Sequence, residues 1–158
     1  MCNLIASLFL SVLCNLSVYQ GTDYEVPVTW TNDFTIELYN GGGMSPGFTR
    51  LFLSTDSCVF RGMYNNKMNV KRFSLTAADK SEILNKLQLF KLGSVKIKKD
   101  IGPAYDKSTT SICFTGGGKA NYCIQDSANS EIEDADKNRF RDAYNYIYTK
   151  AQKKGHWK

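Results

Sequence analysis

Apolar and polar side chains alternate along several short stretches of the chain. In the first of them, Phe34, Ile36 and Leu38 are separated by single, more polar side chains. Alternation with a period of two predicts a β-strand that buries one of its faces. Similar strands are predicted at residues 49–54, 58–64, 70–75, 109–115 and 120–125, and a short edge strand at residues 94–99.

Two other stretches have helical spacing. The first helix is expected to begin at Thr76, because Asp79 follows three residues later, as in a capping box. Its apolar residues are Ile83, Leu84, Leu87 and Phe90, and Gly93 is the predicted stop. The second helix is predicted from residue 135 or 136 to residue 153, with an apolar stripe of Phe140, Tyr144, Ile147, Tyr148 and Ala151.

These elements predict an α+β fold. A meander of about five or six antiparallel strands with two helices packed on one face would bury every apolar stripe. The length of 158 residues fits a single domain. We place this domain at residues 22–153, after a signal sequence at residues 1–21 and before a basic tail at residues 154–158.

The N-terminal segment is expected to direct export. Its apolar run from Leu4 to Leu13 has the length of a signal-peptide core and is short for a membrane span. Cys14 supports a second interpretation, in which it becomes the acylated N-terminus of a lipoprotein. A third is an uncleaved anchor or a buried strand. The expected location is the periplasm, the cell surface or the medium.

The positive charge is concentrated at the C-terminus. Four of the 20 basic residues, Lys150, Lys153, Lys154 and Lys158, lie in the last nine positions, and the remainder nearly balances 15 acidic residues. Because nucleic-acid binding requires a basic face on the folded domain, we expect no nucleic-acid partner. We interpret the terminal lysines as a frayed, solvated tail.

Five cysteines are present, and two of them, Cys2 and Cys14, lie in the predicted signal. A hairpin centred on Gly118 places Cys113 directly opposite Cys123, close enough for a cross-strand disulfide in an oxidising compartment. The alternatives are that the body cysteines are small buried residues, or that Cys58 bridges to one of the pair.

The sequence excludes much catalytic and metal chemistry. The only histidine is His156, near the end of the chain, and no Cys-x-x-Cys motif occurs, so we expect no metal site and no cofactor. The acidic residues between 126 and 136 lack the spacing of a calcium loop and are expected at a helix N-terminus. Paired carboxylates for hydrolysis would come from Glu37, Asp56, Asp79 or Asp106, and no spacing selects two of them.

Two glycine-rich loops are the candidate binding surface. One connects the first two strands at residues 41–48, and the other is the hairpin tip at residues 116–119. Flexible connections are the simpler interpretation, but exposed loops also present backbone and apolar groups to partners. The candidate contact residues are Gly42, Gly43, Met44, Phe48, Gly117 and Lys119.

The order of elements resembles a known family. A glycine-rich turn at residues 42–47 follows the first strand, and Leu51-Phe52-Leu53, the helix with Leu84, a loop with Asp106, a strand pair and a closing helix come after it. This layout, over residues 33–150, resembles emfourin, a small bacterial protein inhibitor of thermolysin-type metalloproteases. It also resembles small bacterial envelope families of unknown function. The turn reads Gly-Gly-x-x-x-Gly, one residue longer than emfourin's, and no inhibitory residue is carried over.

Together these patterns favour an exported, non-enzymatic binding or inhibitor-like module of the cell envelope, with a protein as its partner. The alternatives are a carboxylate-dependent hydrolase of cell-surface polymers and a passive structural lipoprotein. A membrane contact is expected only through the N-terminal segment.

Overall fold

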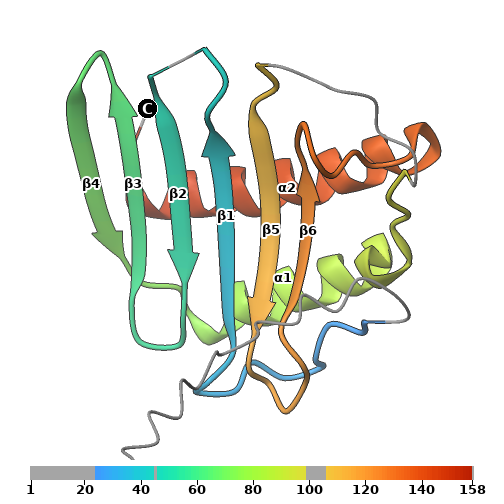
Figure 1. Ribbon diagram of the computed structural model, residues 1–158. Coiled ribbons are helices and arrows are strands. Elements are labelled where there is room, and N and C mark those ends of the chain that lie inside the picture. The colour runs from blue at the N-terminus through green and yellow to red at the C-terminus, as the bar shows by residue number, and fades with distance from the viewer. Residues whose placement is uncertain (1–23, 45, 99–105, 158) are drawn as a thin grey trace, which may run out of the picture.

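The computed structural model describes residues 24–44, 46–98 and 106–157. Six strands form one antiparallel sheet in the order β4-β3-β2-β1-β5-β6 (Figure 1). Their bounds are β1 Thr35–Gly41, β2 Phe48–Leu53, β3 Cys58–Tyr64, β4 Lys67–Phe73, β5 Thr109–Thr115 and β6 Tyr122–Asp126. The predicted α+β architecture is confirmed. Its sheet is a meander of β1 to β4, extended on the other side of β1 by the β5–β6 hairpin.

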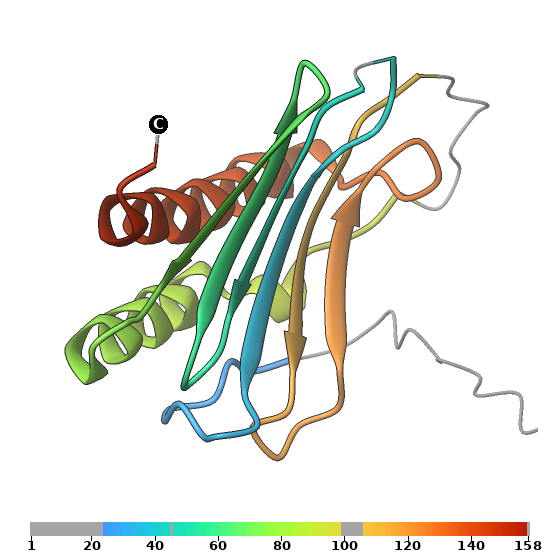
Figure 2. The same cartoon turned by 90° about the vertical axis from the view of Figure 1, so that its left-hand side faces the viewer.

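Both long helices, α1 (Ala77–Phe90) and α2 (Asp134–Gly155), lie on the same side of the sheet (Figure 2). The alternating apolar residues of the strands point toward them and are fully buried, as Leu38, Leu51 and Ile112 illustrate. The helices contribute Leu84 and Ile147 to the same core. One sheet face is therefore sealed by the helices.

Helix α1 begins as the sequence predicts. The Asp79 amide donates to Thr76 Oγ1 at 3.1 Å, and the Thr76 amide donates to Asp79 Oδ2 at 3.1 Å, which completes a capping box. The predicted stop at Gly93 is wrong, because Lys91 ends the helix in the left-handed region at φ 47°. Gly93 instead allows the backbone of Tyr24 to approach closely.

The edge strand predicted at residues 94–99 is not formed over the described part of that range. A short 3-10 helix, Leu92–Ser94, occupies its start, and Ile97 makes only an isolated bridge to Ile132. The alternation of Val95 and Ile97 is real, and both pack against the core. They do so from a segment that follows the left-handed turn at Lys91 and pairs with none of the six strands.

Residues 150–157 are not a frayed tail, and Lys158 lies outside the described residues. Helix α2 continues to Gly155, and Lys150 and Lys154 lie 3.2 Å and 2.8 Å from the carboxylate oxygens of Asp79. Trp157 is buried and stacks on Phe60 with the ring centroids 4.5 Å apart. The lysines therefore join α2 to the start of α1, and Trp157 closes the core beneath β3.

The hairpin register centred on Gly118 is confirmed. Cys113 pairs with Cys123, their Cα atoms lie 4.0 Å apart, and the two residues form a disulfide. Ile112 and Ile124 face each other on the buried side. Cys58 is free and buried, so the alternative bridge through Cys58 is wrong, and burial raises the pKa of its thiol. Cys14 lies outside the described residues.

Loss of the Asp79 carboxylate is expected to destabilise the protein. Burial raises the pKa of Asp79, but hydrogen bonds from Lys154 and Thr76 outweigh it and hold the pKa well below its usual range. We expect Asp79→Asn to lower the free energy of unfolding at pH 7 by about 1–2 kcal/mol, and the exposed Asp142→Asn to leave it unchanged. Denaturant unfolding of both variants measures this, and equal midpoints would contradict the role of Asp79.

The same carboxylate makes a pH-dependent contribution. Because its folded-state pKa is lowered, its stabilisation is fully present above the unfolded pKa of about 4 and is lost as pH falls toward the folded value. The stability difference between wild type and Asp79→Asn should therefore shrink below about pH 4. A difference that grows on acidification would contradict this assignment.

The disulfide is expected to stabilise the β5–β6 hairpin. It closes a loop with a sequence separation of 10, which corresponds to about 2.5–3 kcal/mol in the chain-entropy model. We expect Cys113→Ser/Cys123→Ser to lower the free energy of unfolding by about this amount. The unfolding of Cys58→Ala, measured with and without reductant, shows whether the free thiol also contributes. Equal unfolding midpoints with and without the bridge would contradict the prediction.

Candidate functional site

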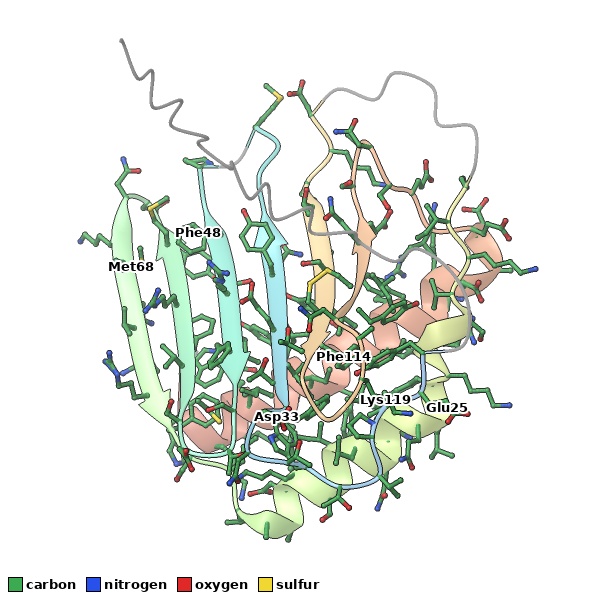
Figure 3. All side chains as sticks on the ribbon, turned by 60° about the horizontal axis from the view of Figure 1, so that its bottom comes forward. Glu25, Asp33, Phe48, Met68, Phe114 and Lys119 are labelled. Atoms are coloured by element: carbon green, nitrogen blue, oxygen red, sulfur yellow. A yellow bond between two sulfur atoms is a disulfide. The ribbon has the colours of Figure 1, made fainter. Side chains whose placement is uncertain are left out.

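The two glycine-rich loops lie at opposite ends of the sheet. The β1–β2 loop follows Gly41, which pairs with Thr109, whereas the β5–β6 tip follows Thr115, which pairs with Thr35. The seven residues of β1 separate them, or about 20 Å. Figure 3 shows Phe48 on one side of this separation and Lys119 on the other. The expectation of one binding surface built from both loops is therefore wrong.

The hairpin tip is held by contacts within the protein. The Gly117 amide donates to Asp33 Oδ2 at 3.1 Å, and Gly116 lies against the backbone of Asp33. Gly116, Gly117 and Gly118 all have positive φ. Glycine adopts this backbone conformation readily, so the turn alone accounts for the three glycines. Lys119 is exposed beside them. The sequence pattern at this tip is accounted for by packing.

The β1–β2 loop presents apolar groups at the other end. Met44 is 85% exposed, and Phe48 is half-buried and stacks on Tyr39. Gly42 and Gly43 have φ of 85° and 67°, and a Cβ on Gly43 would lie 2.8 Å from the carbonyl oxygen of Asp106. Replacing Gly43 would therefore strain the loop, so Met44 is the residue through which this loop can be tested.

The sheet face opposite the helices is uncovered by the described residues (Figure 2). Cross-strand pairing brings Phe48, Met63 and Met68 into one row at the end that carries Met44. Figure 3 shows Phe48 and Met68 on this part of the sheet. Met68 is 55% exposed. Methionine is flexible and polarizable, and suits surfaces that adapt to a partner.

The next rows of the same face carry arginines. Arg50 of β2 pairs directly with Arg61 of β3, which in turn pairs with Val70 of β4. Like charges directly opposite one another on a sheet are destabilising unless other groups neutralise them. Arg50 is neutralised, because its Nε and Nη2 donate to the two carboxylate oxygens of Glu37 at 3.0 Å each. Within the described residues, the Arg61 side chain has no hydrogen bond or ion pair.

A shallow hollow lies between these arginines. Its volume is about 270 Å³, and it is lined by Glu37, Arg50, Phe52, Val59 and Arg61. An aromatic ring, an aliphatic side chain and an unpaired guanidinium meet there. This combination suits an anionic or amphipathic group that enters from solvent. We call the outward residues of β1 to β4, with this hollow at their centre, the open face.

The open face continues into a strongly basic hairpin. Residues 57–78 contain no Asp or Glu, but they contain Arg61, Lys67, Lys71 and Arg72, all exposed. In the described part of the chain none of these four cations has an acidic partner. The near balance of charge over the chain before its last nine residues, 16 basic against 15 acidic side chains, concealed this local excess. A charge count over the β3–β4 hairpin alone was the signal that could have revealed it.

The carboxylates do not gather as a hydrolytic pair. Asp79 and Glu82 lie near each other, but Lys150 bridges them, and hydrogen bonds from Lys150 and Tyr146 lower the pKa of Glu82. Hydrogen bonds from Lys137 and Lys98 lower the pKa of Glu131 to about 2. In the described residues, each carboxyl with a shifted pKa is shifted downward, toward the ionised form.

The acidic run before α2 forms ion pairs with nearby cations. Asp126 contacts Lys107 at 2.7 Å, and Glu131 contacts Lys98 and Lys137 at 3.0 Å and 2.8 Å. Over the residues that are described, no three His, Cys, Asp or Glu side chains cluster as metal ligands. These acids are explained by their lysine partners and by the helix N-terminus.

A second hollow, of about 560 Å³, lies between residues 24–28 and the end of α1. Its lining is mostly apolar side chains and backbone, including Val26, Leu87 and Leu92. Its charged members are Glu25 and Lys91, one of each sign. This hollow has no excess of either charge that would define a ligand, so the open face remains the candidate site.

Comparisons of the chain with protein-family models, curated proteins and solved structures find no match. The resemblance to emfourin stays a prediction. None of the helices in the described residues is both long and apolar enough to cross a membrane. The open face is therefore defined by its own geometry: a sheet surface with methionine side chains, aromatic rings and the unpaired guanidinium of Arg61.

Proposed function

We propose that this protein is an exported, non-enzymatic binding module that takes a protein partner on the open face. The observation that carries the proposal concerns Arg61. It lies directly opposite Arg50 on the neighbouring strand, and its side chain has no counter-charge among the described residues. An unpaired guanidinium opposite a second one is costly in isolation and favourable once an anionic group binds. The partner supplies that group.

The surrounding side chains support a protein rather than a small ion as the partner. Phe52 and Val59 flank the hollow, and the row of Phe48, Met63 and Met68 extends the apolar surface toward Met44. Protein interfaces are enriched in aromatic residues, methionine and arginine. The open face combines all three around one hollow, which is suitable for a single anchoring side chain of the partner.

Two observations bear on export and on the kind of partner. The Cys113–Cys123 disulfide supports an oxidising compartment, because such bonds are rare in reducing ones. The resemblance to emfourin makes an exported peptidase one form of the proposed partner. The carboxylate hydrolase has no supporting site in the described residues, and the passive lipoprotein depends on Cys14.

The partner surface is tested by paired variants. Tagged full-length protein is used to capture partners from the exported fraction of its source cells. The open-face variant is Phe52→Ser/Arg61→Glu, and the control on the outer side of α1 is Leu89→Ser/Lys86→Glu, which makes the same two types of change at exposed positions. We expect the open-face variant to bind the captured protein at least about tenfold more weakly, which is about 1.4 kcal/mol.

Thermal unfolding of both double variants establishes that they are folded. Wild-type affinity in the open-face variant would refute the proposed surface, as would an equal loss in the α1 control. Met44→Ser, measured in the same assay, reports whether the β1–β2 loop belongs to the interface.

Export is tested by the intact mass of the protein from its native source, with and without reduction and alkylation. We expect a mature chain that begins near residues 18–22, with two hydrogens fewer in the Cys113–Cys123 peptide than after reduction. A chain that begins at an acylated Cys14 would instead support the lipoprotein. A full-length chain with reduced cysteines would contradict export.

A further inference from the structure

Strand β4 is a free edge of the sheet. It is seven residues long and is paired on one side only, with β3. In Figure 2 this edge faces the viewer, and no described element lies over it. An edge strand leaves a row of backbone N–H and C=O groups unpaired, and these groups can pair with an added strand.

The hairpin turn defines which groups are free. Asn65 and Asn66 both have positive φ, as in a type I′ turn, so Tyr64 and Lys67 are the hydrogen-bonded pair that flanks it. Pairs alternate along an antiparallel ladder, so the backbone groups of Met68, Val70 and Arg72 point away from β3. These three residues offer their N–H and C=O groups at the outer edge.

The side chains of β4 are sorted by face. Met68 and Val70 lie on the open face and are 55% and 44% exposed. Lys67 and Lys71 project to the other face and are also exposed. An added strand would therefore meet Met68, Val70 and Arg72 on the open face and the two lysines on the other.

Lysines on an edge strand commonly prevent unwanted strand pairing. That function alone does not explain why two exposed apolar side chains alternate with them. Nor does it explain why residues 57–78 lack any acidic side chain that would balance their four cations. The same charge disfavours a second copy of this chain, because two β4 edges would place like charges side by side. A strand that alternates acidic and apolar side chains complements the edge, because its acidic side chains face the lysines and its apolar side chains face Met68 and Val70.

We propose that β4 binds an extended acidic segment of the partner as a seventh strand of the sheet. The segment alternates acidic residues, opposite Lys67 and Lys71, with apolar residues, opposite Met68 and Val70. Its backbone pairs with the outward groups of Met68, Val70 and Arg72. This inference rests on the proposed function and names the partner's chemistry at the β4 border of the open face.

The probe is a fluorescein-labelled ten-residue peptide of alternating Glu and Val, titrated with the full-length protein at low ionic strength. We expect saturable binding that weakens as salt is added. Three peptides serve as controls: one with the Glu and Val residues in two blocks, one with Lys in place of Glu, and one N-methylated at alternate residues. Each control should bind at least about tenfold more weakly, because it lacks the alternation, the charge or the backbone donors.

Two variants of the protein test the edge itself. Val70→Pro removes an N–H that faces solvent, which an edge strand tolerates, and should weaken peptide binding at least about tenfold. Lys67→Glu/Lys71→Glu should do the same by reversing the charge. Its matched control is Lys96→Glu/Lys153→Glu, two exposed lysines elsewhere with the same change of net charge. If Val70→Pro fails to fold, the charge-reversal pair still decides the question.

Equal binding of the alternating and block peptides would overturn the proposal, as would equal affinity in the two double-lysine variants. Tighter binding of a single-stranded oligothymidine than of the acidic peptide would show that the basic hairpin serves nucleic acid instead. Concentration-dependent dimerisation lost in Val70→Pro would assign the edge to a second copy. Loss of the captured partner by Phe52→Ser/Arg61→Glu but not by Lys67→Glu/Lys71→Glu would preserve the open face and refute the edge.

Discussion

Burial of one face of the sheet by two helices is the constraint on which the rest of the structure depends. Leu38, Leu51 and Ile112 point toward α1 and α2 and are excluded from water, so the register of each strand is set by which side chains face the helices. Because side chains alternate between the two faces of a strand, the remaining side chains lie on the opposite face of the sheet. The open face is the consequence of a core that needs only one side of the sheet.

The C-terminal residues pack against the helix side of β3 and β4. Asp79 accepts hydrogen bonds or ion pairs from Thr76, Lys150 and Lys154, which ties the start of α1 to the last turns of α2. Trp157 then stacks on Phe60 beneath β3. The basic hairpin is thus held from the helix side, while its outer face and its edge stay free of described contacts. A supported strand with a free edge is a suitable platform for strand addition.

Local patterns predicted the local structure well. Alternation identified the strands, the Thr76–Asp79 spacing identified a helix start, and symmetry about Gly118 predicted the Cys113–Cys123 bridge. The failures arose where distant segments meet. No local pattern indicates that Lys154 reaches Asp79, or that the two glycine-rich loops lie at opposite ends of β1. The basic hairpin was missed for a related reason, because acids elsewhere in the sequence offset its charge in the total.

The most direct test of this account is whether the open face is accessible in the full-length protein in solution. Methyl NMR spectra recorded with a soluble paramagnetic gadolinium chelate report the exposure of each side chain. The account predicts strong broadening of the methyl signals of Val59, Met63, Met68 and Val70, while those of Leu38, Leu51 and Ile112 remain sharp. Equal protection of the two sets would mean that the face is covered, and it would contradict a binding surface there.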